Sequence, residues 1–197
     1  MKAIFVLVTL LMLSGRAVEL PTVTIETPLG NITVEVDTAH APVTAGNFLK
    51  YVNAGLYDGG RFYRVTRPDN YTPAPPNRPA MEIIQGGIDP AKRSQGFPPI
   101  PLERTSVTGL KHVAGTISMA RGGPDSATSE FFILLDDQPS LDFGGKRFDD
   151  EQGAAAFGHV TAGMDVVRKI QQQGPMQEAR KDYLVTPVPI TRMSLVK

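Results

Sequence analysis

Short runs of alternating apolar and polar residues recur along most of the chain. They extend from Val23 to Ile25 and from Ile32 to Val36, on either side of a Pro28-Leu29-Gly30 turn. Side chains on a strand point to opposite faces in turn, so alternation on both sides of a turn predicts a β-hairpin. Further short strands are predicted at Phe62–Val65, Met81–Gln85, Thr116–Ala120, Phe131–Leu135, Ala155–Val160 and Val188–Val196.

Two segments instead show the spacing of helices. The first begins at Pro42 and ends before Gly55, with an apolar face formed by Ala45, Phe48, Leu49 and Val52. The second follows Gly163 and stops at Gly174-Pro175, with an apolar face formed by Val166, Val167 and Ile170. Proline suits a first helical turn, and Gly-Pro ends a helix. About eight strands and two helices predict a mainly β fold, a closed eight-stranded antiparallel barrel capped by two α-helices, with a filled interior.

The first seventeen residues differ from the rest. Lys2 is followed by an apolar run over Ala3–Leu13 and then by small residues up to Ala17. This order is typical of a secretory signal peptide, and the run is shorter than the roughly 20 residues of a membrane-spanning helix. A buried strand and an uncleaved anchor are the alternatives. We expect residues 1–17 to be removed, leaving a single domain over residues 18–197 that is periplasmic or secreted and not attached to a membrane.

Composition excludes several classes of function. Twenty basic and twenty acidic residues balance, so no general electrostatic attraction to nucleic acid is expected. With no cysteine, the chain has no disulfide, no cysteine-zinc site and no thiol nucleophile, and we expect no bacterial lipid anchor because the predicted cleavage site lacks a cysteine. The acidic clusters 136–137 and 149–151 lack the spacing of a calcium loop, so no metal or cofactor is expected. Prolines crowd the segment Pro68–Ala80, which predicts an exposed loop.

Three predicted strands carry a polar and an apolar residue two positions apart. Residues i and i+2 of a strand face the same side. If the strands are neighbours, their common face is a groove that can hold an extended peptide, with a cation beside an apolar slot. The three pairs are Phe62 with Arg64, Ile83 with Gln85, and Glu130 with Phe132.

Several motifs resemble the cyclophilin family of peptidyl-prolyl cis-trans isomerases, in the family's order and approximate spacing. They extend over most of the chain after Pro21. They are Ala45-Gly46-Asn47-Phe48, Tyr57-Asp58-Gly59-Gly60-Arg61-Phe62-Tyr63-Arg64-Val65, Ile84-Gln85-Gly86-Gly87, Gly115-Thr116-Ile117-Ser118-Met119-Ala120, Ser129-Glu130-Phe131-Phe132-Ile133, Leu141-Asp142 and Phe157-Gly158. The resemblance implies a bacterial, exported isomerase that acts as a monomer on proline-containing polypeptides during their folding.

The resemblance also implies roles for individual residues. Arg64 is the catalytic cation, and Gln85 is the amide that orients near it. Ile83, Phe132 and Leu141 correspond to the apolar pocket for the proline ring. Ala120 and Arg121 correspond to the stretch that holds the peptide backbone, and Glu130 stands at a substrate-binding position where an amide is usual.

Isomerisation breaks no bond and needs no nucleophile or metal. An X–Pro bond must cross a barrier of about 18–20 kcal/mol because resonance keeps the amide planar. A guanidinium that donates to the nitrogen of the twisted amide stabilises the transition state preferentially. Glu130 can pair with Arg64 and restrain it, or with Arg121 and leave Arg64 free; we expect the second arrangement.

Other departures from the family pattern are Glu82, Ser140 and the lack of a histidine aligned with the family's pocket histidine. They keep open a second interpretation, a proline-peptide binding module or chaperone on the same fold with little turnover. A third is a barrel that encloses a small ligand, against which the apolar strand pattern argues.

Overall fold

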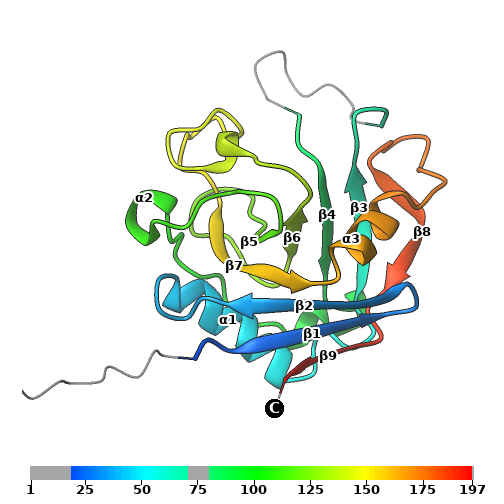
Figure 1. The fold of residues 1–197 in the computed structure, drawn as a ribbon, viewed down its shortest axis with the longest axis horizontal. Coiled ribbons are helices and arrows are strands. Elements are labelled where there is room, and N and C mark those ends of the chain that lie inside the picture. Colours follow the sequence, from blue (N-terminus) through cyan, green and yellow to red (C-terminus); the bar gives the residue numbers. More distant parts are fainter. Residues whose placement is uncertain (1–18, 71–79, 197) are drawn as a thin grey trace, which may run out of the picture.

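A single antiparallel sheet of nine strands curls round on itself (Figure 1). The structure is a computed structural model that describes residues 19–70 and 80–196. The strands are β1 (Thr22–Thr27), β2 (Gly30–Val36), β3 (Arg61–Thr66), β4 (Ile83–Gly87), β5 (Thr116–Met119), β6 (Phe131–Leu134), β7 (Ala155–Ala162), β8 (Tyr183–Pro189) and β9 (Arg192–Leu195). Their order in the sheet is β8-β3-β4-β6-β5-β7-β2-β1-β9.

The predicted mainly β, antiparallel fold is confirmed, with nine strands in place of eight. The segment predicted as one strand over Val188–Val196 contains the end of β8 and all of β9, with a turn between them. Among the described strands, the edges β8 and β9 do not pair with each other. The turn itself joins the two sides: the Ile190 amide donates to the Gly60 carbonyl at 2.8 Å, and the Thr191 amide donates to the Glu26 carbonyl at 2.9 Å.

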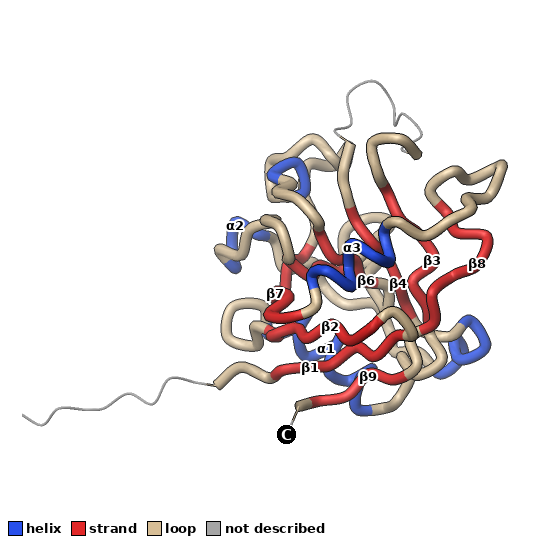
Figure 2. Tube along the Cα trace, turned by 45° about the vertical axis from the view of Figure 1, so that its right-hand side comes forward, coloured by secondary structure: helices blue, strands red, loops and turns tan. Residues whose placement is uncertain are grey.

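Both predicted helices are present, as α1 (Pro42–Asn53) and α3 (Met164–Gln171). Helix α1 contacts β7 and β9, whereas α3 contacts β2, β3 and β4 (Figure 2). The structure adds a short helix, α2 (Thr105–Thr108), and two 3₁₀ helices, η1 (Pro90–Gln95) and η2 (Pro139–Leu141). These short elements carry no periodic pattern of their own.

Side chains fill the interior of the curled sheet. Phe48, Phe62, Phe131 and Phe157 are all fully buried, and Phe131 lies with its ring centroid 5.7 Å from that of Phe62 and from that of Phe48. A space packed with aromatic rings leaves no room for a ligand. The interpretation as a ligand-enclosing barrel is therefore wrong.

A β-bulge on β3 decides which side chains face outward. Phe62 is opposite Gly86 of β4, but Arg64, two residues later, is opposite the adjacent Gln85. Tyr63 is thus the extra residue of the bulge. Phe62 is buried in the core while both Tyr63 and Arg64 are partly exposed, so the prediction that Phe62 and Arg64 share a face is wrong.

Two predictions fall wholly or largely outside the described residues. They are the signal peptide at 1–17 and the proline-rich loop, of which residues 71–79 are not described. Within residues 19–70 and 80–196, no helix combines the length and apolar composition that crossing a membrane requires.

Candidate functional site

A cavity of about 210 Å³ opens on the outer face of the sheet, near β3, β4 and β6. It brings together seven of the eight residues that the sequence predicted for the site. They are Arg64, Ile83, Gln85, Ala120, Arg121, Phe132 and Leu141. The eighth, Glu130, lines neighbouring cavities.

The apolar wall of this cavity is a cluster separate from the main core. Gln85 is opposite Phe132 across the β4–β6 pairing, and Ile83 is opposite Leu134. Leu141 joins the cluster from η2, and Met81 from the segment before β4. The backbone pairing holds these side chains in one patch. It offers an apolar surface against which a small ring can be buried.

Arg64 lies at the edge of this patch and is held at two points. Its Nε donates to Asp182 Oδ2 at 2.6 Å, and its Nη1 donates to Gln85 Oε1 at 2.8 Å. A guanidinium carries five N–H donors, so these two contacts leave further donors unused among the described residues. The side chain is 18% exposed, which keeps the cation within reach of a ligand in the cavity.

A second part of the network runs away from the cavity. Gln85 Nε2 donates to the Tyr63 hydroxyl at 2.8 Å, and that hydroxyl donates to Glu130 Oε2. Burial, and then the nearby charge of Glu130, raise the pKa of Tyr63 well above its usual range, so the phenol stays a neutral donor. Gly87 admits this arrangement, because a Cβ there would lie 2.9 Å from the carboxyl carbon of Glu130.

Arg121 is engaged elsewhere. Its Nη1 and Nη2 donate to the two carboxylate oxygens of Asp150 at 2.8 and 2.7 Å, and its guanidinium lies 3.8 Å from the ring centroid of Phe148. The hydrogen bond from Arg121 lowers the pKa of Asp150. The expected Glu130–Arg121 pair is therefore wrong. Glu130 binds neither arginine, because Asp150 reaches Arg121 and Tyr63 reaches Glu130.

Sequence reasoning missed His112, which supports the cavity from behind. Its ring stacks on Phe132 with the centroids 6.4 Å apart. Nδ1 lies 2.8 Å from Asp142 Oδ1, and Nε2 lies 2.9 Å from Ser118 Oγ. A ring protonated on Nδ1 satisfies both partners, which fixes the ring against Phe132. No local motif marks this histidine.

The comparison with known families identifies the chain's relatives. The family described as "Cyclophilin type peptidyl-prolyl cis-trans isomerase/CLD" matches residues 22–195. The chain belongs to the cyclophilin family. It is 38% identical over 151 residues to peptidyl-prolyl cis-trans isomerase A of Dickeya dadantii, covering 76% of this chain and 70% of that protein. It is 34% identical to peptidyl-prolyl cis-trans isomerase B of Escherichia coli, covering 83% and 94%.

Solved cyclophilins share this fold. A cyclophilin from Cryptosporidium parvum superposes with a TM-score of 0.68 at 22% identity, covering 90% of this chain and 98% of that one. The family and its named relatives establish the activity: the chain is a peptidyl-prolyl cis-trans isomerase, with proline-containing peptides as substrates. Among the described residues, no group of three or more histidine or carboxylate side chains is placed to hold a metal ion.

Proposed function

We propose that the 210 Å³ cavity binds the proline of an X–Pro bond and that Arg64 is the catalytic residue. One observation carries this proposal: a doubly anchored cation with unused donors borders an apolar patch formed by Ile83, Phe132 and Leu141. The patch holds the ring while the acyl side of the bond rotates.

Arg64 acts on the amide nitrogen. As the bond leaves planarity, conjugation is lost and the nitrogen regains a lone pair that can accept a hydrogen bond. Because the nitrogen can accept this bond only once the amide is twisted, the interaction is stronger in the transition state than in the ground state. An anchored guanidinium meets this acceptor without first having to be ordered. Gln85 and Asp182 supply the anchoring.

The size of this effect limits what Arg64 can do alone. A hydrogen bond from a charged donor is worth about 1.5–3 kcal/mol, which corresponds to roughly 10- to 150-fold in rate. Burial of the proline ring and contacts near Ala120 and Arg121 supply the remainder. Arg121 is already paired with Asp150, so we assign it to shaping the cavity wall.

The test is the variant Arg64→Ala with a proline peptide in a protease-coupled assay. Loss of the donor should raise the activation free energy by about 2–4 kcal/mol, more than the hydrogen bond alone because Asp182 is left unpaired, and so lower kcat/KM roughly 30- to 1000-fold, while peptide binding falls much less. Arg192→Ala, on the exposed side of β9, is the control. An unchanged rate in Arg64→Ala rejects its role. A parent protein that binds the peptide but does not accelerate exchange would support the binding-module interpretation.

We further propose that the isomerase is exported and acts as a monomer on folding proteins outside the cytoplasm. The support is the sequence of residues 1–17, in which Lys2 precedes a short apolar run that ends near Ala17. Expression of the full chain in a bacterium, followed by mass measurement of the periplasmic protein, should find a chain that begins near Val18. A full-length chain confined to the cytoplasm contradicts the proposal. Size-exclusion chromatography with light scattering tests the monomer.

A further inference from the structure

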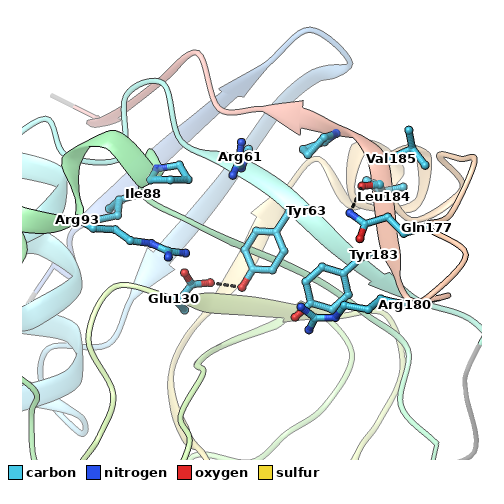
Figure 3. Close-up of a pocket in the computed structure, with 12 residues that line it drawn as sticks. Arg61, Tyr63, Ile88, Arg93, Glu130, Gln177, Arg180, Tyr183, Leu184 and Val185 are labelled. Carbon is cyan, nitrogen blue, oxygen red and sulfur yellow. Dashed lines mark hydrogen bonds between the residues drawn. The ribbon is translucent and has the colours of Figure 1, made fainter.

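A second and larger cavity lies on the same outer face, next to the proposed proline site. Its volume is about 440 Å³. Tyr63 and Tyr183 form part of its floor, with ring centroids 5.5 Å apart. Tyr183 also lines the proline cavity, so the two cavities share a wall. The Tyr63–Glu130 hydrogen bond lies within the second cavity (Figure 3).

Three arginines from separate segments line this second cavity. Arg61 belongs to β3, Arg93 to η1, and Arg180 to the segment before β8. Figure 3 shows Arg93 and Arg180 on opposite sides of Tyr63 and Glu130. Against these three cations, Glu130 is the single carboxylate among the described residues that line the cavity.

The charges of these arginines are not neutralised by ion pairs with other described residues. Within the described part of the chain, neither Arg61 nor Arg93 has a salt bridge or a side-chain hydrogen bond, and both are exposed. Arg180 stacks on Tyr183, 3.2 Å from the ring centroid, which positions the cation without neutralising it. Glu130 already accepts the Tyr63 hydroxyl. The charges of the whole chain balance, so this is a local excess of cationic donors.

The distance to the proline site suits one continuous peptide. Arg61 and Arg64 are three residues apart on β3, and the bulge shortens their separation by about one position. With about 3.3 Å per strand residue, that separation is roughly 7–10 Å. A fully extended peptide covers the same distance in two or three residues, and a less extended one in up to four, so a side chain two to four residues from the proline reaches the second cavity.

We propose that the arginine-lined cavity is a subsite for an acidic side chain of the polypeptide substrate, two to four residues from the proline. This inference rests on the proposed proline site at Arg64. Guanidinium groups bind carboxylates through charge-assisted hydrogen bonds, and the tyrosine floor accommodates the methylene groups of Asp or Glu. The isomerase thereby favours X–Pro bonds in acidic segments of its substrates.

The experiment compares matched peptides by NMR exchange spectroscopy, which needs no coupling protease. Each acetylated, amidated peptide has one Ala-Pro bond in a neutral sequence, with Glu or Gln placed two, three or four residues before or after the proline. For exposed ion pairs we expect kcat/KM to be about two- to fivefold higher for Glu than for Gln at one or more of these positions. At high salt this ratio should approach one, because exposed charges are screened.

The double variant Arg61→Gln/Arg93→Gln should reduce the Glu/Gln ratio to near one. The control Arg168→Gln/Arg192→Gln removes the same charge from exposed positions on α3 and β9 and should keep the parent's ratio. A ratio near one at all positions in the parent, or an equal loss in both double variants, overturns the subsite.

Calorimetric binding of the same peptides separates the subsite from the proposed catalytic site. A parent that binds Glu peptides more tightly than Gln peptides, yet accelerates exchange in neither, supports the subsite and overturns the role of Arg64. A parent that accelerates exchange equally in both kinds of peptide, and binds them equally, overturns the subsite and leaves Arg64 supported.

Discussion

Arg64 and Asp182 form a partly buried ion pair with 2.6 Å between Nε and Oδ2, and their side chains are 18% and 21% exposed. Asp182 directly precedes Tyr183, the residue of β8 that lies opposite Arg64 in the sheet. The strand pairing therefore sets the position of the carboxylate. Because Gln85 holds the same guanidinium through Nη1, the cation has little freedom to turn away from the cavity.

Asp182 is accordingly a positioning residue, and Asp182→Ala should lower kcat by about tenfold with a smaller change in KM. The loss reflects the entropy of ordering a free arginine side chain, up to about 2 kcal/mol. Asp182→Asn keeps an oxygen that can accept from Nε and should stay within about threefold of the parent. Steady-state kinetics over a range of peptide concentrations separates kcat from KM. Equal kcat in the alanine variant and the parent contradicts the positioning role.

Glu130→Gln should retain most of the activity, with a loss of no more than about threefold on a neutral peptide. The side-chain oxygen of glutamine can still accept the Tyr63 hydroxyl, so the chain of hydrogen bonds through Gln85 to Arg64 persists. Glu130→Ala removes this acceptor and should cost more. The protease-coupled assay measures both variants. Complete loss of activity in Glu130→Gln would mean that the carboxylate charge itself is required.

Phe132→Leu tests the apolar wall. Phe132 is 5% exposed and lies between the cavity and the ring of His112. Loss of the part of the ring that faces the proline should raise KM by roughly five- to tenfold, which corresponds to burial of one to two fewer CH₂ groups at about 0.8 kcal/mol each. The control Phe131→Leu alters the adjacent residue, which is fully buried in the main core, and should lower stability without a selective effect on KM. Similar KM values in both variants exclude Phe132 from the proline pocket.

The fold was predictable where burial follows a simple period. The β1–β2 hairpin and the apolar faces of α1 and α3 all matched their patterns. Most of strand β8 was missed, because only Leu184 and Val188 are buried along it, four residues apart, and Val185 is exposed. The bulge on β3 was also missed, since it depends on the register with β4 and the sequence of β3 alone does not indicate it.

The site was predictable as far as its residues belong to local motifs. Seven of its predicted residues share one cavity because the motifs lie on strands that the sheet brings together. The partners that hold those residues were not predictable: Asp182 is 118 positions from Arg64, and Asp150 is 29 positions from Arg121. Only tertiary structure places these carboxylates beside their arginines. This is why Glu130 was assigned the wrong partner.

A pH-dependent contribution to stability should arise behind the cavity, at Asp142. Burial of this carboxyl opposes its ionisation, but hydrogen bonds from the side chain and backbone of His112, with the charge of Lys111, outweigh burial and lower its pKa below the usual 3.8. A carboxyl whose folded pKa is depressed stabilises the fold fully above its unfolded pKa. That stabilisation is lost as the pH falls through the folded value. The relevant window therefore lies below about pH 4.

Urea unfolding of the parent and Asp142→Asn at pH 5 and pH 3 measures this contribution. At pH 5 the variant should be less stable by about 1–3 kcal/mol, since His112 loses a charged acceptor inside the protein. At pH 3 the difference should shrink, because this pH lies below the usual carboxyl pKa of 3.8: the unfolded chain takes up a proton that folded Asp142 resists, which offsets part of the stabilisation. Asp165→Asn, which breaks an exposed pair with Lys169 on α3, should change stability little at either pH. A gap between parent and Asp142→Asn that widens at pH 3 would reverse the sign and show that Asp142 is not stabilised as an anion.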